Sequence, residues 1–191
     1  AVAGAERVFD VLDEKEEENE GQDTADFSSI KGEVEFYDVS FSYEEGGDTV
    51  TNVNFCVSPG ETVAFVGPTG AGKSTMMNLL SRFYDADGGT ITIDGHDITK
   101  IKRESLRRHM AFVLQDSFLF HGSMRENIRY GRLEATDEEV EEAAKNANAH
   151  TFIMKLPEGY ETILGQDGSG ISQGQKQLLS IARAILTNPT I

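Results

Sequence analysis

A glycine-rich stretch near the middle of the chain constrains its fold more than any other feature. Residues 67–74 read Gly-Pro-Thr-Gly-Ala-Gly-Lys-Ser and fit the pattern G-x-x-x-x-G-K-[ST]. The apolar run 62–66 before them is typical of a strand buried on both faces, and residues 74–83 after them carry apolar side chains at helical spacing. Strand, glycine loop and helix in this order are the context in which the pattern binds phosphate. The chain is therefore predicted to hold a nucleoside triphosphate.

Each position of the loop has a distinct predicted role. Backbone N–H groups of the glycine loop surround phosphate oxygens, and the start of the helix adds the positive end of its dipole. Lys73 is predicted to reach the outer phosphates and Ser74 to ligate Mg²⁺. The predicted nucleotide-binding residues of this stretch are Gly67, Pro68, Thr69, Gly70, Ala71, Gly72, Lys73, Ser74 and Thr75. The alternative is a glycine turn that binds nothing, and it is disfavoured because every fixed position is filled in the right setting.

The composition describes a soluble globular protein. The 191 residues are 38% hydrophobic and 26% charged, which is enough apolar material for one good core. The net charge of −16 argues against nucleic acid as a partner, because no basic surplus is present to neutralise a phosphate backbone. No apolar window approaches the length of a membrane span and no signal peptide opens the chain, so these residues are expected in the cytosol. The single Cys56, in an alternating strand, is predicted to be buried.

The first 30 residues are expected to precede the folded part. Residues 1–12 carry apolar side chains at spacings of three and four, as in the end of an amphipathic helix, and residues 10–20 are strongly acidic, as in a solvated linker. The next region alternates in the manner of β-strands over residues 34–43 and 53–57, with a turn at 45–48, which predicts an antiparallel sheet. Ile91 and Ile93 continue the strand pattern.

A further short apolar strand is predicted over residues 110–114, ending at Gln115. From about residue 118 to 165 the pattern is mainly helical, and Thr136 with Glu139 forms a predicted capping box. A second glycine-bearing element, residues 171–175, opens the helical run 177–186, with Ser172 as the expected N-cap. Taken alone, such an element is more often a plain cap than an anion site.

Together these motifs resemble the nucleotide-binding domain of an ATP-binding cassette (ABC) transporter, of the exporter type in which that domain follows a membrane domain on one polypeptide. The matching stretches appear in the family's order and cover nearly the whole chain: GEVEFYDVSFSY, GPTGAGKST, RFYDADGGTITIDGHDI, LQDSFLFHGSMRENIRYG and ISQGQKQLLSIARAIL. The resemblance implies an α/β fold, with a P-loop NTPase core, an antiparallel β subdomain and an α-helical subdomain. The core sheet is expected to be incomplete.

The resemblance also implies roles for particular residues. Tyr43 corresponds to the aromatic residue that stacks on adenine, and Gln115 to the Q-loop glutamine that helps to place Mg²⁺ and the attacking water. The implied catalytic residues are Lys73 and Gln115, and the implied Mg²⁺ ligands are Ser74 and Gln115. The signature motif, which faces the ATP of a second subunit, corresponds to Ser172, Gln173, Gly174 and Gln175. For Tyr43 an ordinary strand aromatic, and for Gln115 a merely solvated amide, remain the alternatives.

The implied function is an ATP-binding and hydrolysing cassette that powers export, with ATP and Mg²⁺ as ligands. The implied partners are a second cassette, identical or not, and the transmembrane domain of the same transporter, at the cytoplasmic face of the cell membrane. The chain is expected to divide into four parts. Residues 1–30 are the end of a membrane-domain helix with an acidic linker, and residues 31–117 are the β subdomain with the P-loop core. Residues 118–170 are the helical subdomain, and residues 171–191 are the signature motif with its helix.

Three departures from the family's pattern bear on activity. Gln173 stands where the signature usually has glycine, and Gln166 stands where the exporter loop usually has glutamate. The aspartate and general-base glutamate that the resemblance implies after the signature helix have no candidate in these residues. Weak nucleotide binding and negligible turnover are therefore expected of residues 1–191. Two alternatives remain: a degenerate regulatory nucleotide-binding module in a heterodimeric transporter, and a soluble ABC ATPase.

The resemblance further implies a surface for the membrane domain. In the family, the helical subdomain receives the coupling helices of the membrane domain in a groove. Phe118, Leu119 and Phe120 are expected to supply apolar surface for this purpose next to Gln115. Internal packing of these side chains is the alternative.

Overall fold

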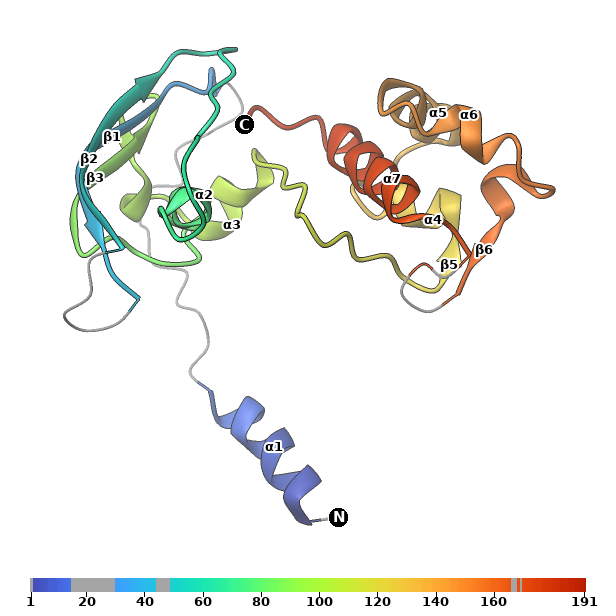
Figure 1. Ribbon diagram of the computed structural model, residues 1–191, viewed down its shortest axis with the longest axis horizontal. Helices are drawn as coiled ribbons and strands as arrows, with labels where there is room; N and C mark the ends of the chain where they lie inside the picture. Colours follow the sequence, from blue (N-terminus) through green and yellow to red (C-terminus); the bar gives the residue numbers. More distant parts are fainter. Residues whose placement is uncertain (1, 15–29, 44–48, 166–167, 169) are drawn as a thin grey trace.

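The chain forms two units joined by extended segments, with one further helix at the N-terminal end (Figure 1). A computed structural model describes residues 2–14, 30–43, 49–165, 168 and 170–191, and of residues 2–6 it describes the helix only. The predicted acidic linker from residue 15 onward, the turn at 45–48 and Gln166 lie outside the described residues. We call residues 30–110 the sheet unit and residues 118–187 the helical unit.

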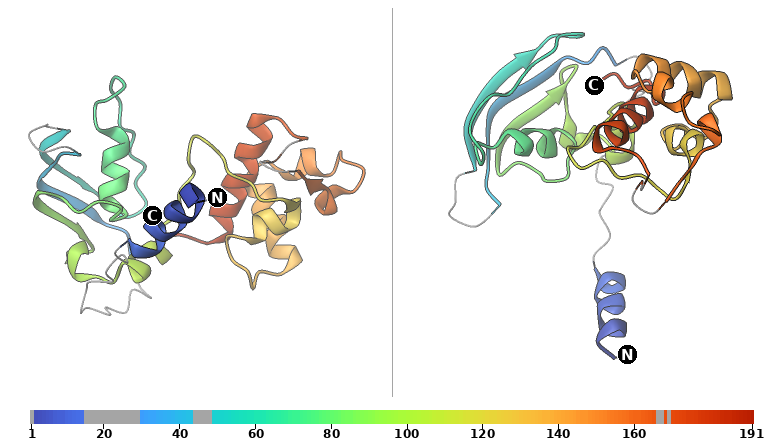
Figure 2. Two further views of the ribbon diagram at one scale, coloured as in Figure 1. Left: turned by 90° about the horizontal axis from the view of Figure 1, so that it is seen from below. Right: turned by 45° about the vertical axis from the view of Figure 1, so that its right-hand side comes forward.

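The sheet unit is a four-stranded antiparallel sheet with helices on one face (Figures 1 and 2). Its strand order is β2 (Val50–Val57), β1 (Val34–Phe41), β3 (Gly88–Ile93) and β4 (His96–Asp97), and β1 pairs with both β2 and β3. Alternation along β1 directs Val34 and Phe36 into the core, as the sequence predicts. This unit also contains α2 (Lys73–Leu80), the 3₁₀ turn η2 (Ile98–Lys100) and α3 (Arg103–Arg108).

Two of the predicted strands do not form. Residues 62–66 and 110–114 run without helix or strand, and Val66 is 93% exposed although a strand buried on both faces was expected there. The physical reason is that a strand exists only through backbone hydrogen bonds to a neighbour, and in the described part of the chain neither segment has a strand beside it. Several of their apolar side chains, among them Phe112 and Leu114, are consequently exposed, whereas Met110 stays buried in the core of the sheet unit.

The prediction that Cys56 is buried is also wrong. Cys56 lies on β2, which is an edge strand of the sheet, and it pairs with Glu35 across the ladder. Glu35 is exposed, and the thiol lies on the same solvent-facing side. Val53, Phe55 and Val57 pack against the core, so alternation places Cys56 on the opposite face, and this position overrides the general tendency of cysteine to be buried.

The helical unit packs α4 (Met124–Arg129), α5 (Asp137–Asn146) and α7 (Gln173–Leu186) around a core of its own. Its centre contains fully buried Met124, Ile128, Val140 and Leu179, and each such side chain contributes about 1.5–3 kcal/mol relative to exposure. Ser123, Thr136 and Ser172 begin helices with complete capping boxes, which confirms the two caps predicted from sequence. This unit also contains β5 (Gly122–Ser123), α6 (His150–Ile153), η3 (Gly159–Glu161) and β6 (Ile163–Leu164).

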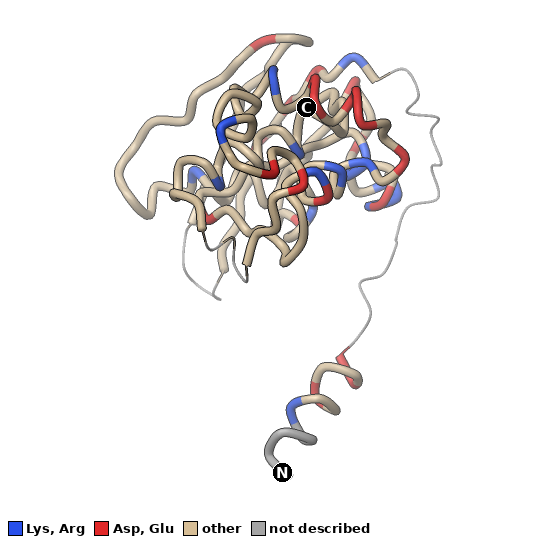
Figure 3. The backbone as a smooth tube through the Cα atoms, turned by 90° about the vertical axis from the view of Figure 1, so that its right-hand side faces the viewer, with Lys and Arg blue, Asp and Glu red and all other residues tan. Residues whose placement is uncertain are grey.

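Charged residues of opposite sign lie side by side on the helical unit, which faces the viewer in Figure 3. The acidic start of α5 is covered by arginines: Arg129 pairs with Asp137, and Arg132 pairs with Glu139 at 2.5 Å. Arg125 forms an ion pair with Glu161 at 2.7 Å. Burial alone would lower the pKa of the Arg125 guanidinium, but Glu161 and the nearby carboxylates of Asp137 and Glu141 raise it overall. Several carboxylates of this unit are therefore compensated by neighbouring arginines.

Two stretches of chain join the units: residues 111–117 lead out of the sheet unit, and residues 188–191 return to it (Figure 1). The return is fixed by backbone bonds, because Ile191 N–H donates to the His109 carbonyl at 3.0 Å and the Ile191 carbonyl accepts from Ala111 N–H at 3.0 Å. Leu119 is 1% exposed and belongs to the helical core, so the expectation that it adds to an exposed surface is wrong. Phe118 and Phe120 on either side of it are exposed.

Helix α1 (Val2–Asp13) lies apart from both units (Figures 1 and 2). Its formation agrees with the helical spacing in the sequence, and its apolar side chains Val8, Phe9, Val11 and Leu12 are all exposed. Across the described residues, the helices are all too short or too polar to cross a membrane.

Candidate functional site

The glycine loop owes its shape to backbone conformations that other residues adopt only with strain. Gly70 has φ +85° and Gly72 has φ +77°, both in the left-handed region that favours glycine. Gly72 is also the N-cap of α2, and its carbonyl accepts from Met76 N–H at 3.1 Å to begin the helix. The loop therefore ends where the N–H groups of a helix start, as predicted for an anion site.

Gly72 is further restricted by its neighbours in the sheet. A Cβ atom placed there would lie 2.4 Å from Val50 Cγ1 and 3.2 Å from the Thr49 carbonyl oxygen. At Gly70, by contrast, a Cβ would meet nothing within 4 Å. The end of the loop is thus packed directly against the start of β2, and its tip projects into open space.

Lys73 folds back over the loop that precedes it. Its ammonium donates hydrogen bonds to the carbonyl oxygens of Gly67 and Pro68, each at 2.7 Å. These carbonyls hold a positive charge over the loop, at the N-terminal end of α2, where the helix dipole also favours an anion. A bound phosphate offers the same ammonium charged acceptors in place of neutral ones.

Ser74 and Gln115 lie on the same cleft although they are far apart in the sequence. A cavity of about 390 Å³ between α2 and the segment 110–115 is lined by both residues, together with Met77, Phe83 and Phe112 among others. Ser74 is exposed at the first turn of α2, so its hydroxyl is available to a ligand. Within the described ranges, three or more His, Cys, Asp or Glu side chains do not gather into a metal site.

Tyr43 lies beside α2, near the loop. Its hydroxyl donates to Thr75 Oγ1 at 3.2 Å and accepts from Asn78 Nδ2 at 3.2 Å. Its ring packs edge-on against Phe41 and Tyr84, at centroid distances of 4.8 and 5.0 Å. The structure thus places Tyr43, which is expected to stack on adenine, close to the glycine loop. The Tyr43 side chain remains 47% exposed.

The predicted signature residues begin α7 in the other unit. Ser172 Oγ accepts from Gln175 N–H at 3.2 Å and Gln175 Oε1 accepts from Ser172 N–H at 2.9 Å, so both side chains take part in the cap. Gln173 and Gly174 are exposed between them. The start of α7 is the end of that helix away from the sheet unit, and the structure does not bring it to the loop of the same chain (Figure 1).

Sequence reasoning missed Arg183 and Asn127. Arg183 lies on α7 and donates to the Asn127 carbonyl at 2.9 Å and to the Phe118 carbonyl at 3.1 Å. Burial lowers the pKa of the Arg183 guanidinium, and the nearby Tyr130 offsets this lowering only in part. The available signal was an arginine at helical spacing with the apolar residues Leu179 and Leu186.

Comparison with known proteins identifies the family. Residues 50–191 match the ABC transporter family. The chain is 61% identical over its whole length to an uncharacterized ABC transporter ATP-binding protein, YfiC, of Bacillus subtilis (strain 168), and 50% identical over its whole length to a fatty acid ABC transporter ATP-binding/permease protein of Mycobacterium bovis. It spans 32% and 30% of the length of these two relatives.

A solved structure of an ABC exporter has the same fold as this chain. The structure of a bacterial Atm1-family ABC exporter with ATP bound superposes with a TM-score of 0.84 at 38% identity, over 98% of this chain and 33% of that one. This likeness confirms the predicted α/β P-loop fold with its antiparallel β and α-helical parts, even though two predicted strands are not formed. The chain belongs to the ABC transporter family and is an ATP-binding domain of that family.

Proposed function

We propose that this chain is the ATP-binding and hydrolysing cassette of an exporter. The observation that carries the proposal is the loop 67–72, with its two left-handed glycines, its junction with α2 and the Lys73 ammonium folded over it. ATP binds with its phosphates at the loop and the first N–H groups of α2, and the Lys73 ammonium exchanges its two carbonyl acceptors for phosphate oxygens. Tyr43 stacks on the adenine ring.

Ser74 and Gln115 hold Mg²⁺ in this proposal. Mg²⁺ in nucleotide sites is bound by one or two protein groups, with phosphate oxygens and waters completing its octahedron, so a dedicated cluster of carboxylates is not required. The Ser74 hydroxyl and the Gln115 amide oxygen suit this arrangement because both are oxygen donors on one cleft. When bound there, Mg²⁺ would neutralise charge on the phosphates, and Gln115 would also orient the attacking water.

A second cassette completes the site. In a single chain the start of α7 lies in a different unit from the loop, which supports a head-to-tail pair in which Ser172, Gln173, Gly174 and Gln175 of each chain face the ATP held by the other. The Ser172 cap leaves the first N–H groups of α7 at an exposed helix start, suited to a phosphate. The pair is formed by two copies of this chain or by this chain and a related one.

The remaining partner is a transmembrane domain on the same polypeptide, with the cassette at the cytoplasmic face of the membrane. Relatives named ATP-binding/permease proteins, of which this chain spans about a third, support this arrangement. We divide the chain at 1–30, 31–117, 118–170 and 171–191, so that α1 is the end of the membrane-domain helix. The exposed Phe118 and Phe120, which pack edge-on at 5.2 Å, provide the surface for that domain.

Residues 1–191 are expected to bind Mg·ATP weakly and not to hydrolyse it. Lys73→Ala should weaken binding at least about tenfold, because a charged hydrogen bond contributes about 1.5–3 kcal/mol and each 1.4 kcal/mol is tenfold. Titration calorimetry measures the affinity and phosphate release measures turnover. Lys155→Ala, which removes an exposed lysine of the helical unit, is the matched control and should bind normally. Equal binding by the Lys73 variant would exclude the site, and Lys73-dependent turnover would show that this segment is catalytically sufficient.

In the full-length protein, Phe118→Ala should lower the stimulation of ATP hydrolysis by transport substrate severalfold. The reason is that the exposed Phe118 ring belongs to the proposed contact with the membrane domain, whereas ATP binds at the sheet unit. Basal hydrolysis and its stimulation are measured on the same preparation. Leu133→Ala, which truncates another exposed apolar residue of the helical unit, serves as the control. Normal stimulation in Phe118→Ala would remove this residue from the contact.

A further inference from the structure

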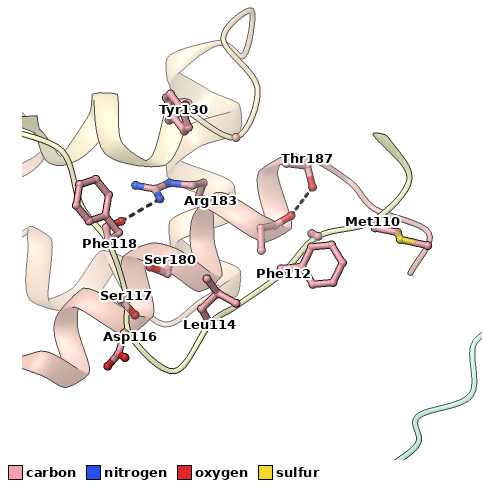
Figure 4. A pocket seen from close by; sticks show the side chains of 13 residues that line it. Met110, Phe112, Leu114, Asp116, Ser117, Phe118, Tyr130, Ser180, Arg183 and Thr187 are labelled. Carbon is pink, nitrogen blue, oxygen red and sulfur yellow. Dashed lines mark hydrogen bonds between the residues drawn. The ribbon is translucent and has the colours of Figure 1, made fainter. Parts of the chain in front are cut away.

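Arg183 holds together three parts of the helical unit. Its side chain projects from α7 toward the segment that leaves the sheet unit, as Figure 4 shows for its hydrogen bond to the Phe118 carbonyl. Its Nε donates to the Asn127 carbonyl at 2.9 Å, and a second terminal nitrogen donates to Asn127 Oδ1 at 3.3 Å. The guanidinium also lies 5.5 Å from the ring centroids of both Phe120 and Tyr130.

Asn127 extends this set of contacts to the same segment. It is 2% exposed, its Oδ1 accepts from Phe120 N–H at 2.9 Å, and its Nδ2 donates to the Phe120 carbonyl at 3.0 Å. Arg183 and Asn127 therefore bind the backbone at residues 118 and 120 through three hydrogen bonds. We call residues 115–120 the linking segment and these two side chains the clamp.

The linking segment joins Gln115 to the clamp over a short distance of chain. It forms neither helix nor strand, so its position depends on contacts such as these rather than on its own secondary structure. The clamp residue Arg183 lies on α7, which is a 14-residue helix without a break. Arg183 is eleven residues from Ser172, which corresponds to about 16 Å at a helical rise of about 1.5 Å per residue. The clamp therefore fixes the linking segment to the same unbroken helix that begins at the predicted signature residues.

We propose that Arg183 is a positioning residue that couples Gln115, through the linking segment and the clamp, to the Ser172–Gln175 end of α7. This inference rests on the proposed function, because Gln115 and the Ser172–Gln175 end of α7 meet ATP in different subunits of the pair. It adds the residue that fixes the linking segment to α7 within one chain. Lysine cannot replace arginine in this role, since a single ammonium cannot span the separate carbonyls and lie against two rings.

The test uses the full-length protein that contains this chain, purified in detergent, with ATP hydrolysis as the readout. Arg183→Lys is expected to lower kcat at least tenfold while the KM for ATP stays within twofold, because the nucleotide loop lies in the other unit. Arg132→Lys is the matched control: this exposed arginine of the same unit pairs with Glu139 and should keep both constants. A purely structural role would instead lower the yield of folded protein and leave kcat per folded molecule unchanged, and that outcome would overturn the proposal.

A second variant covers the case in which Arg183→Lys does not fold. Tyr130 is 57% exposed, so Tyr130→Leu removes one of the two rings at the guanidinium with little risk to the core. It should lower kcat two- to fivefold with KM unchanged, and an unchanged kcat would overturn the coupling. Failure of the proposed function would give a different result. Either the full-length protein would not hydrolyse ATP, or its Lys73→Ala variant would still hydrolyse it.

Discussion

Gly72→Ala is expected to weaken Mg·ATP binding by residues 1–191 roughly 30-fold to 3,000-fold. Two costs add at this position. A side chain in the left-handed region costs about 1–2 kcal/mol, and forcing a methyl group into a filled space costs about 1–3 kcal/mol. Gly72 has φ +77°, and its added Cβ would lie 2.4 Å from Val50 Cγ1. The loop can relieve both only by leaving the conformation in which its N–H groups surround a phosphate.

The control for this prediction lies two residues earlier. Gly70 has φ +85° but open space around its missing Cβ, so Gly70→Ala incurs the conformational cost alone and should weaken binding only about 5- to 30-fold. Titration with Mg·ATP measures both variants, and hydrogen exchange of β1 and β3 checks that the sheet unit remains folded. Equal losses for the two variants would mean that the contact with Val50 has no part in shaping the loop.

Local signals in the sequence predicted local structure correctly. Thr136 and Ser172 were recognised as caps because a capping box depends on residues only three apart, and both boxes are complete in the structure. The glycine loop was located for the same reason, since its pattern spans eight consecutive residues. Alternation likewise predicted β1 and β2, whose apolar faces pack against the same core.

What the sequence could not supply depends on partners distant in the chain. Residues 62–66 and 110–114 have the apolar character of buried strands, but a strand also needs a neighbour, and apolar character does not identify one. The side chains that hold Tyr43 are 32 and 35 residues away, and Arg183 is 65 residues from the carbonyl that it binds at Phe118. A single sequence contains no pattern that pairs such positions, so these contacts emerged only from the fold.

The separation of the two cores makes a second prediction with a large effect. Leu179 is fully buried on α7, where that helix packs against α4 and α5. Leu179→Ala should destabilise the helical unit by about 3–5 kcal/mol, because it removes buried apolar surface and leaves a cavity. The buried residues of the sheet unit form a different cluster, so the loss should be confined to the helical unit.

Hydrogen exchange resolved by residue measures this effect, since it reports the opening free energy of each unit separately. In Leu179→Ala, amides of α5 and α7 should lose protection while amides of β1 and β3 keep theirs. Leu133→Ala makes the same chemical change at a side chain that is 70% exposed, and it should change neither. An equal loss in β1 and β3 would show that the two units unfold together. The few backbone bonds of Ile191 to the sheet unit would then transmit stability between the cores, and a nucleotide bound at the loop would be expected to protect α7 as well.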